Sequence, residues 1–355
     1  MSVCAILINY LGAHEIAGAV QSVLADAPDV QVVVVDNSED DIEWALLETL
    51  LPPSVRRIRS PGNIGFGQGC NLALQHVDAP YIFLVNPDVR LLPGCTHALL
   101  DTLADHSNCS AVAPRQFLDA NCQWFLPQSW QPTSVRAWVT ERALREVAVA
   151  RRVSRAARSE HLRFWKATSP VCQRALSGGV VMVRRNALRP GELLFDPRFF
   201  MYFEDSDLCM RLRRRGTDLL VAPQAGAVHA WQNLPHKAPL MEQSAQLFFE
   251  KYYASDNVFL CKSRLLAANA AQRESFLFEP VHSSVIHVPA LWQDGWLLEL
   301  SPTPLIQPAV GMFGAGHEAF VSAEIFQRFA GAAVFGRLSS KASRGIDEAL
   351  LFCWR

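Results

Sequence analysis

The first 115 residues alternate short, wholly apolar runs with segments of helical periodicity, and this alternation constrains the fold more than any other feature. The clearest runs cover residues 3–8, 32–35 and 81–85, and none shows the polar alternation of a strand with one wet face. Strands that are apolar on both faces are typical of parallel sheets covered by helices on each side. The sequence therefore predicts an α/β fold with a mostly parallel central sheet flanked by helices.

The pattern changes twice after residue 115. Residues 116–176 contain a basic helical stretch, with nine Arg or Lys and three Glu between positions 136 and 166. Strands are then expected at 218–222 and 225–230, and short strands with Pro and Gly turns follow in the last hundred residues. We predict a large domain over residues 1–260, with a basic helical insertion at 116–176, and a β-rich C-terminal appendage over residues 261–355.

Charge and composition exclude several classes of protein. The chain has 33 basic and 34 acidic residues, so no basic excess points to a nucleic-acid partner. No apolar run approaches the ~18 residues of a membrane span, and the first residues lack the basic region of a secretory signal. Nine scattered cysteines without zinc-type spacing indicate a reducing compartment. We expect a cytoplasmic protein of undetermined oligomeric state.

The basic stretch between residues 136 and 166 allows two interpretations. It is either a solvated helical face or a surface that docks on anionic lipid headgroups or on an anionic acceptor. The aromatic residues of the C-terminal region also allow two interpretations. Either they line an acceptor groove or they form the core of a small β subdomain; the residues concerned are Trp292, Trp296, Phe313 and His317.

Polar side chains follow three of the predicted strands. Asn9 follows the first, Asp36 and Asn37 the second, and Asn86 and Asp88 the run at 81–85. Ligands of an open α/β sheet bind beyond the carboxyl ends of the strands, so these side chains predict a shared crevice. Asp36 could accept hydrogen bonds from a base or a ribose. Asp88 is a hard oxygen ligand of the type that holds Mg²⁺ or Mn²⁺ on a diphosphate.

Two common nucleotide-binding motifs are absent. A dinucleotide fold would have G-x-G-x-x-G directly after the first strand, where residues 9–12 read NYLG. The glycine-rich segment 65–69 lies far downstream and lacks the Lys-Ser/Thr of a P-loop. Hydride transfer and P-loop NTP hydrolysis are therefore disfavoured.

Several motifs in order make the sequence resemble the family 2 glycosyltransferases of GT-A fold, particularly their rhamnosyltransferase-like branch. The resemblance covers roughly residues 3–260 at family-like spacing. The matching pieces are Asn9-Tyr10, Asp36-Asn37-Ser38, NIGFGQGCN at 63–71, Asn86-Pro87-Asp88, Ser177-Gly178-Gly179 and FDPRFFMYFEDSDL at 195–208.

The resemblance implies a site for a pyrimidine nucleotide-sugar. Asp36 would receive the base with Asn9 beside it, and Asn63 and Asn71 would flank the nucleotide. The implied donor-binding residues are Asn9, Tyr10, Asp36, Asn37, Asn63, Gly65, Phe66, Asn71, Asn86, Gly178 and Gly179.

The resemblance also implies a metal site and a catalytic base. Asp88 would hold Mg²⁺ or Mn²⁺, although Asn86 replaces the first carboxylate of the family's D-x-D-like motif. His229 lies where the family often supplies a further ligand; the alternative is a partly buried strand histidine. Asp205 would be the base and Glu204 would orient the acceptor or its loop, whereas an isolated Asp205 would be interpreted as a helix cap.

From these residues and the resemblance we predict an enzyme, a metal-dependent inverting glycosyltransferase of cell-surface polysaccharide synthesis. The favoured donor is dTDP-L-rhamnose, with UDP-sugars as the other class, and the acceptor is a hydroxyl of a glycan or a lipid-linked saccharide. Peripheral association with the inner face of the cytoplasmic membrane would accompany such an acceptor. Two alternatives stay open: a non-catalytic nucleotide-sugar or carbohydrate-binding protein on the same fold, and a nucleotidyltransferase.

Overall fold

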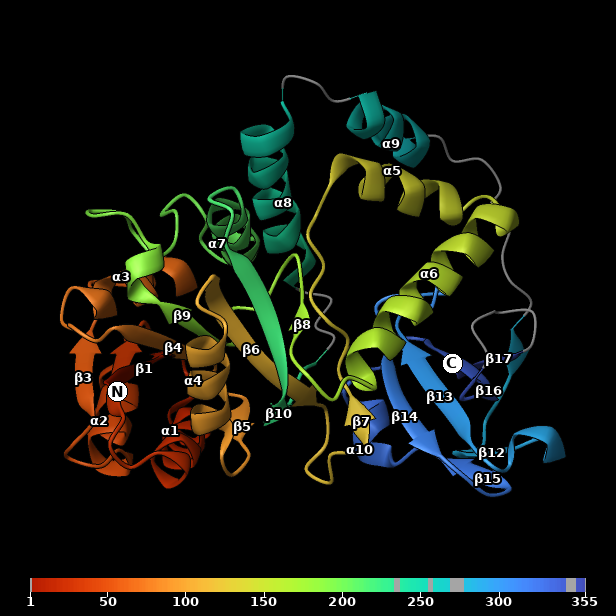
Figure 1. The fold of residues 1–355 in the computed structure, drawn as a ribbon, viewed down its shortest axis with the longest axis horizontal. Coiled ribbons are helices and arrows are strands. Elements are labelled where there is room, and N and C mark those ends of the chain that lie inside the picture. The colour runs from red at the N-terminus through yellow and green to blue at the C-terminus, as the bar shows by residue number, and fades with distance from the viewer. Residues whose placement is uncertain (1, 233–236, 255–257, 269–277, 343–348, 355) are drawn as a thin grey trace.

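The computed structural model describes residues 2–354 except 233–236, 255–257, 269–277 and 343–348 (Figure 1). Its N-terminal half is built on four parallel strands in the order β4-β1-β2-β3. The strands are β1 (Val3–Asn9), β2 (Gln31–Asp36), β3 (Arg56–Arg59) and β4 (Tyr81–Val85). The helices between and after them are α1 (Ala13–Asp26), α2 (Asp41–Leu50), α3 (Phe66–Leu74) and α4 (Cys95–Asp105). The predicted α/β fold is confirmed.

Alternate residues of each strand pack into two separate cores, one on each face of the sheet. Ala5 and Leu7 of β1 face one core, and Cys4 and Ile6 face the other. All four side chains are buried, which explains why the run shows no polar alternation.

The sheet continues through strands of mixed direction. β9 (Val180–Arg184) lies antiparallel between β4 and β6 (Cys109–Phe117), and β10 (Asp218–His229) runs parallel to β6. The prediction of two strands at 218–222 and 225–230 is wrong, because β10 is one strand whose register against β6 shifts between Ala222 and Gly226. Pro223 in that bulge lacks a backbone N–H, which gave the segment the appearance of a turn. Two short strands pair with β10: β5 (Val89–Leu91) and β8 (Val171–Cys172).

The C-terminal strands extend the same sheet through β7 (Trp124–Phe125), which pairs with both β6 and β14. These strands are mostly antiparallel: β11 (Glu279–Pro280), β13 (Trp296–Ser301), β14 (Val310–Gly314), β16 (Val334–Ser340) and β17 (Leu350–Trp354). A separate pair, β12 (Val285–His287) and β15 (Glu318–Phe320), and helix α10 (Ala323–Gln327) complete the region. Trp296 is buried in its core, as the subdomain interpretation requires.

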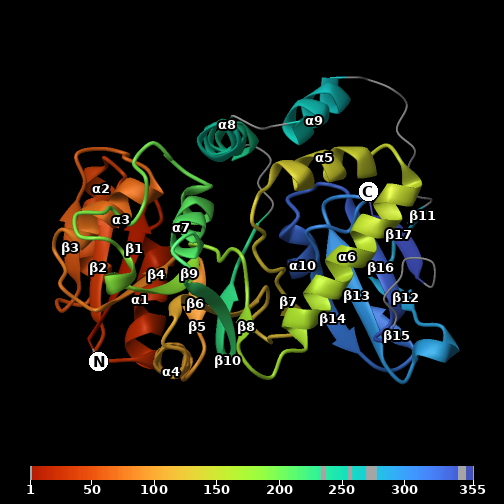
Figure 2. The same cartoon turned by 45° about the horizontal axis from the view of Figure 1, so that its top comes forward.

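Five helices lie around the centre of the chain. α7 follows β9, and α8 and α9 follow β10, whereas α5 and α6 form the insertion. Their bounds are α5 (Ser134–Ala143), α6 (Val147–Trp165), α7 (Glu204–Arg213), α8 (Ala238–Tyr253) and α9 (Val258–Ala268). Both views show α6 lying across β13 and β14 (Figures 1 and 2).

A charged cluster joins α6 to the C-terminal strands. Arg158 of α6 pairs with Glu299 of β13, and Arg337 of β16 binds the same carboxylate through two contacts of 2.7 Å. All three side chains are 0% exposed. The basic stretch was expected to be an exposed face, and this is wrong for Arg158, because the helix buries that side against the sheet.

The insertion and the C-terminal strands therefore share one core, which also contains Leu118, Trp124 and Leu126. The division of the chain at residue 260 stays a prediction. Within the described residues, no helix is both long and apolar enough to cross a membrane.

Candidate active site

Asn9 and Asp36 meet where β1 and β2 end side by side. The Asn9 amide donates to Asp36 Oδ1 at 3.0 Å and to Glu43 Oε1 at 3.0 Å, and the Ser38 hydroxyl donates to the same Asp36 oxygen at 2.6 Å. Asn9 Oδ1 and Asp36 Oδ2 are buried acceptors without a partner among the described residues. Buried polar atoms are usually satisfied, so a donor from a ligand is the natural partner for this pair.

The glycine-rich segment 65–69 is hydrogen-bonded to the residue that follows β2. Asn37 donates to the carbonyl of Gly65 at 3.0 Å, and the backbone N–H of Phe66 donates to the carbonyl of Phe200 at 3.1 Å. Gly65 has φ +81°, and a Cβ there would lie 2.1 Å from the Phe200 oxygen. Only glycine allows the two loops to approach this closely.

The other residues of this region that were predicted to bind the nucleotide-sugar differ in their surroundings. Tyr10 is 55% exposed, and Asn63 Oδ1 accepts from the N–H of Gly65. Asn71 is buried, and its amide spans the backbone of Phe195, donating to the carbonyl at 2.8 Å and accepting from the N–H at 3.0 Å. Both polar groups of Asn71 are thus used within the protein, an arrangement that suits loop positioning better than ligand contact.

Asp88 and His229 form a close pair, with His229 Nε2 3.3 Å from Asp88 Oδ2. The other ring nitrogen, Nδ1, lies 2.8 Å from Gln116 Oε1 and must carry the proton of that hydrogen bond. Nε2 therefore faces the carboxylate with its lone pair when the ring is neutral. A histidine oriented through its second nitrogen beside a carboxylate is typical of metal sites.

Burial alone would raise the pKa of Asp88, but the hydrogen bond and charge of His229 outweigh burial and hold that pKa below its usual range. Among the described residues, no group of three or more His, Cys, Asp or Glu side chains could enclose a metal ion. The Asp88–His229 pair could hold a cation together with further ligands, such as water and the oxygens of a substrate.

The segment Ser177–Gly179 lies between this pair and Asp205. A Cβ on Gly178 would lie 3.4 Å from the Asp205 Cβ, and one on Gly179 would lie 2.9 Å from the His229 ring and 3.2 Å from the Asn86 amide nitrogen. The N–H of Asn86 also donates to the Gly179 carbonyl at 2.7 Å. The structure thus brings Asn86, His229 and Asp205 together around two glycines.

Asp205 is held by backbone donors at the start of α7. The N–H of Gly178 donates to its Oδ2 at 3.1 Å and the N–H of Ser206 to its Oδ1 at 2.6 Å. Burial nevertheless raises the pKa of Asp205. Burial and the charge of Asp205 also raise the pKa of the neighbouring Glu204, whose Oε2 is buried without a partner among the described residues. The two carboxyl groups therefore favour a state with one proton between them.

The turn before α7 adopts an unusual conformation. Tyr202 and Phe203 have φ of 70° and 65°, in the left-handed region that side chains rarely adopt. Ser244 of α8 donates to the carbonyl of Met201 at 2.7 Å, and Phe248 packs on Phe203 with ring centroids 5.5 Å apart. Helix α8 thus supports the turn that presents Glu204 and Asp205.

A cavity of about 300 Å³ opens beside His229. Gln116, Ser177 and His229 form one wall, and C-terminal residues including Leu300, Val310 and Phe329 form another. Sequence reasoning missed Gln116 and this second wall. Gln116 lies near the end of β6, so the strand-end signal that identified Asp36 could have found it; the C-terminal wall has no comparable signal.

The arginines that follow Asp205 are mostly paired. Arg211 and Arg215 both contact Glu192, and Arg211 also contacts Asp207. Both guanidinium groups are therefore held by acidic neighbours.

Comparison with known proteins gives a consistent result. Residues 2–170 match the family model described as glycosyl transferase family 2. N-acetylglucosaminyl-diphospho-decaprenol L-rhamnosyltransferases of two Mycobacterium tuberculosis strains, CDC 1551 / Oshkosh and ATCC 25618 / H37Rv, are each 28% identical over 264 residues. The match covers 67% of this chain and 76% of those proteins.

Two solved structures are more distant. GalNAc-T7 with UDP, GalNAc and Mn²⁺ aligns with a TM-score of 0.48 and 14% identity, over 70% of this chain and 48% of that chain. The mannosyltransferase PcManGT from Pyrobaculum calidifontis, with GDP-Man and Mn²⁺, aligns with a TM-score of 0.48 and 16% identity, over 77% and 76% of the two chains.

The sheet and the family match define a glycosyltransferase of GT-A fold. Residues 2–170 match family 2 of that class, and the chain is similar to rhamnosyltransferases at 28% identity over 67% of its length.

Proposed function

We propose that the chain is a metal-dependent inverting glycosyltransferase that moves L-rhamnose from dTDP-L-rhamnose to a lipid-linked saccharide. The observation that carries the proposal is the position of Asp205 and the Asp88–His229 pair on two sides of Gly178 and Gly179. The choice of sugar and acceptor is supported by the similar rhamnosyltransferases, whose name specifies a diphospho-decaprenol acceptor.

The donor would lie along the strand ends. The free acceptor atoms of Asn9 and Asp36 match the N–H donor that a pyrimidine base presents. The glycines at 178 and 179 let the backbone approach the sugar or the diphosphate without a side chain between them.

Asp205 would remove the proton from the acceptor hydroxyl as that oxygen attacks the anomeric carbon from the face opposite the leaving group. Its two backbone hydrogen bonds fix the carboxylate. Glu204, protonated beside an ionised Asp205, adds no second negative charge next to the base. The cavity beside His229 would receive the acceptor sugar.

The residues present suit a divalent cation. Asp88 and His229 would hold Mg²⁺ or Mn²⁺, with Gln116 fixing the ring orientation. When bound, the cation stabilises the charge that develops on the departing diphosphate.

An assay of donor hydrolysis with Mn²⁺ tests the proposal. A panel of dTDP- and UDP-sugars is incubated with the full chain, and the released products are identified. Release of a nucleoside diphosphate supports a glycosyltransferase; release of pyrophosphate would indicate a nucleotidyltransferase, and no release with or without acceptor would indicate a binding protein.

Asp88→Asn is expected to raise the Mn²⁺ concentration that gives half-maximal hydrolysis by about tenfold or more, because the pair loses its only negative charge. Activity at each metal concentration measures this shift. Asp41→Asn, an exposed change on α2, is the matched control. An unchanged metal requirement in Asp88→Asn would exclude Asp88 as a ligand.

On acidification, the rate is expected to fall at a pH above the ordinary aspartate pKa of 3.8. Burial raises the pKa of Asp205, and only its ionised form accepts a proton. Glu204→Gln replaces a carboxyl that is protonated while Asp205 ionises by another neutral group, so this acid limb of the profile should stay at the same pH. Profiles of kcat/KM for both proteins give the measurement, and a limb that moves to lower pH in the variant would show that the charge of Glu204, rather than burial, raises the pKa of Asp205.

The lipid-linked acceptor would bring the protein to a membrane surface. Three arginines of α6 are exposed: Arg151, Arg152 and Arg155. Peripheral association through these arginines stays a prediction.

A further inference from the structure

A second and larger cavity lies next to the one beside His229. Its volume is about 770 Å³, within the range of small-molecule sites. Ser129 and Trp130 line both cavities, so the two cavities adjoin along this segment of the chain. Two of its lining residues, Arg136 and Arg163, belong to the basic stretch 136–166, for which the sequence allowed an anionic acceptor.

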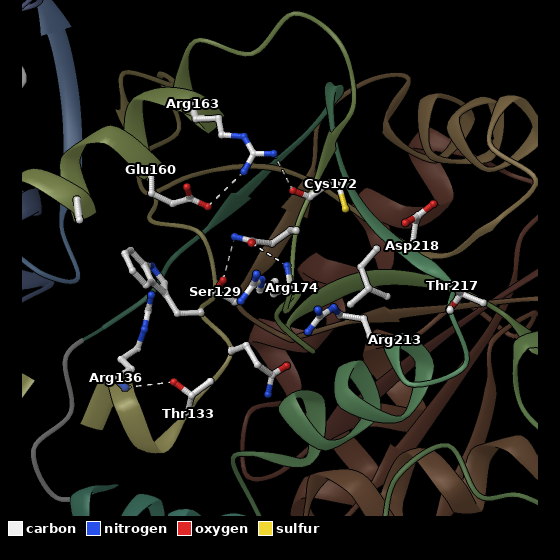
Figure 3. Close-up of a pocket in the computed structure, with 16 residues that line it drawn as sticks. Ser129, Thr133, Arg136, Glu160, Arg163, Cys172, Arg174, Arg213, Thr217 and Asp218 are labelled. Atoms are coloured by element: carbon white, nitrogen blue, oxygen red, sulfur yellow. Dashed lines mark hydrogen bonds and ion pairs between the residues drawn. The ribbon is translucent and has the colours of Figure 1, made fainter. Parts of the chain in front are cut away.

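Four arginines from four parts of the chain surround this cavity, as Figure 3 shows. Arg136 comes from α5, Arg163 from α6, Arg213 from the end of α7, and Arg174 from the loop after β8. We call them the arginine pocket.

Two acids, Glu160 and Asp218, also line the cavity, and each already has a partner. Glu160 lies 3.7 Å from Arg163, and Asp218 accepts from Asn108 at 2.9 Å. Positive charge therefore exceeds negative charge by two within the lining.

Several hydrogen-bond donors that line this pocket have no acceptor among the described residues. Within the described part of the chain, no hydrogen bond or ion pair engages the guanidinium of Arg174 or Arg213. Gln131 is only 6% exposed, yet neither its amide nitrogen nor its oxygen has a partner there. Arg136 Nη1 is buried and unpartnered in the same way. Unsatisfied buried donors beside excess positive charge indicate a missing anion.

The pKa and the packing of Arg136 also favour an anion in the pocket. Burial and the positive charge of Arg174 lower the pKa of Arg136 and Glu160 raises it, which leaves the pKa at about 10. Its guanidinium stacks 3.6 Å from the centre of the ring of Trp130, which lines both cavities. An anion in the pocket would offset the repulsion between Arg136 and Arg174.

The position of the pocket fits the two ends of one acceptor. Arg174 lines the arginine pocket, and Ser177, three residues later, lines the cavity beside His229. Three residues span at most about 11 Å. A sugar in one cavity and a phosphate group attached to it in the other could therefore belong to the same molecule.

We propose that the arginine pocket binds the diphosphate of a lipid-linked acceptor whose sugar occupies the cavity beside His229. This inference rests on the proposed function for the identity of the acceptor. A diphosphate presents several oxygens to guanidinium groups, which bind such oxygens in pairs.

Inorganic pyrophosphate is the first probe. Titration calorimetry without metal, at fixed ionic strength, compares the full wild-type chain with Arg174→Gln/Arg213→Gln. We expect affinity to fall at least about tenfold in the double variant, since charge-assisted hydrogen bonds are lost. Arg152→Gln, an exposed change on α6, is the matched control and should bind as wild type does. Equal affinity in the double variant would overturn the pocket.

The donor site would bind phosphates through a metal ion, so wild type, the double variant and Asp88→Asn are also titrated with Mn²⁺ present. Binding that appears only with Mn²⁺, and that Asp88→Asn loses while the double variant keeps it, would place the anion at the donor site and overturn the proposal. If the double variant has a lowered melting temperature, the single variant Arg174→Gln is titrated in its place.

Kinetics separate an acceptor diphosphate from free phosphate. A saccharide diphospho-lipid is compared with the same saccharide on a neutral alkyl group. Wild type should prefer the diphospho acceptor in kcat/KM, and the double variant should lose that preference through a higher KM. A preference that survives would show that the pocket serves some other anion. Absence of donor hydrolysis in wild type would count against the proposed function while leaving the pyrophosphate result intact.

Discussion

Asp205→Asn is expected to lower kcat for glycosyl transfer by about 10²- to 10⁴-fold, the usual contribution of a general base. The amide keeps one acceptor oxygen, for the N–H of either Gly178 or Ser206, and cannot take a proton. KM for the donor should change little, because the donor groups assigned to the strand ends are untouched. Initial rates with a saturating acceptor give the measurement.

The same variant separates catalysis from helix capping. If Asp205 only stabilised α7, Asp205→Asn would lower the melting temperature and leave kcat near wild type. Because burial raises the pKa of this carboxyl, a neutral amide should be tolerated in the fold. A stable variant with full activity would remove Asp205 from the mechanism.

Glu299→Ala is expected to lower the free energy of unfolding by about 3–5 kcal/mol, the typical loss when one partner of a buried ion pair is removed. Arg158 and Arg337 would then face each other in a dry interior without a carboxylate. The present ion pairs hold the pKa of Glu299 well below its usual range despite burial, so the carboxylate is ionised.

Urea unfolding of the full chain measures the effect of Glu299→Ala. Glu318→Ala on β15 is the control: its side chain is 48% exposed, and its contact with His287 is long, at 3.8 Å. That variant should change the free energy of unfolding by less than about 0.5 kcal/mol. A similarly small change for Glu299→Ala would mean that the buried cluster contributes little to stability.

Local sequence patterns were sufficient to predict the part of the fold in which elements close in sequence pack together. Apolar runs predicted β1, β2 and β4, and the rule that ligands bind at strand ends selected Asn9 and Asp36, which the structure places in contact. The pairing of Asp88 with His229 was also predicted, although only from the family resemblance.

What escaped prediction depends on contacts between distant parts of the chain. Arg158 and Glu299 are 141 positions apart, and nothing near either residue indicates that a basic helix will bury one face against a later strand. The continuity of β10 was hidden by Pro223, because a bulge and a turn use the same residues. The arginine pocket draws on four separate segments, and the sequence singled out only the basic stretch 136–166 among them.

The left-handed turn at Tyr202 and Phe203 makes the catalytic centre sensitive to remote changes. Each such residue costs about 1–3 kcal/mol and persists only where its surroundings enforce it. Ser244 and Phe248 of α8 provide that enforcement from outside the cleft. Loosening α8 would let the backbone relax and withdraw Asp205 from the position proposed for the base, so changes in a helix that contributes none of the proposed catalytic residues would lower activity.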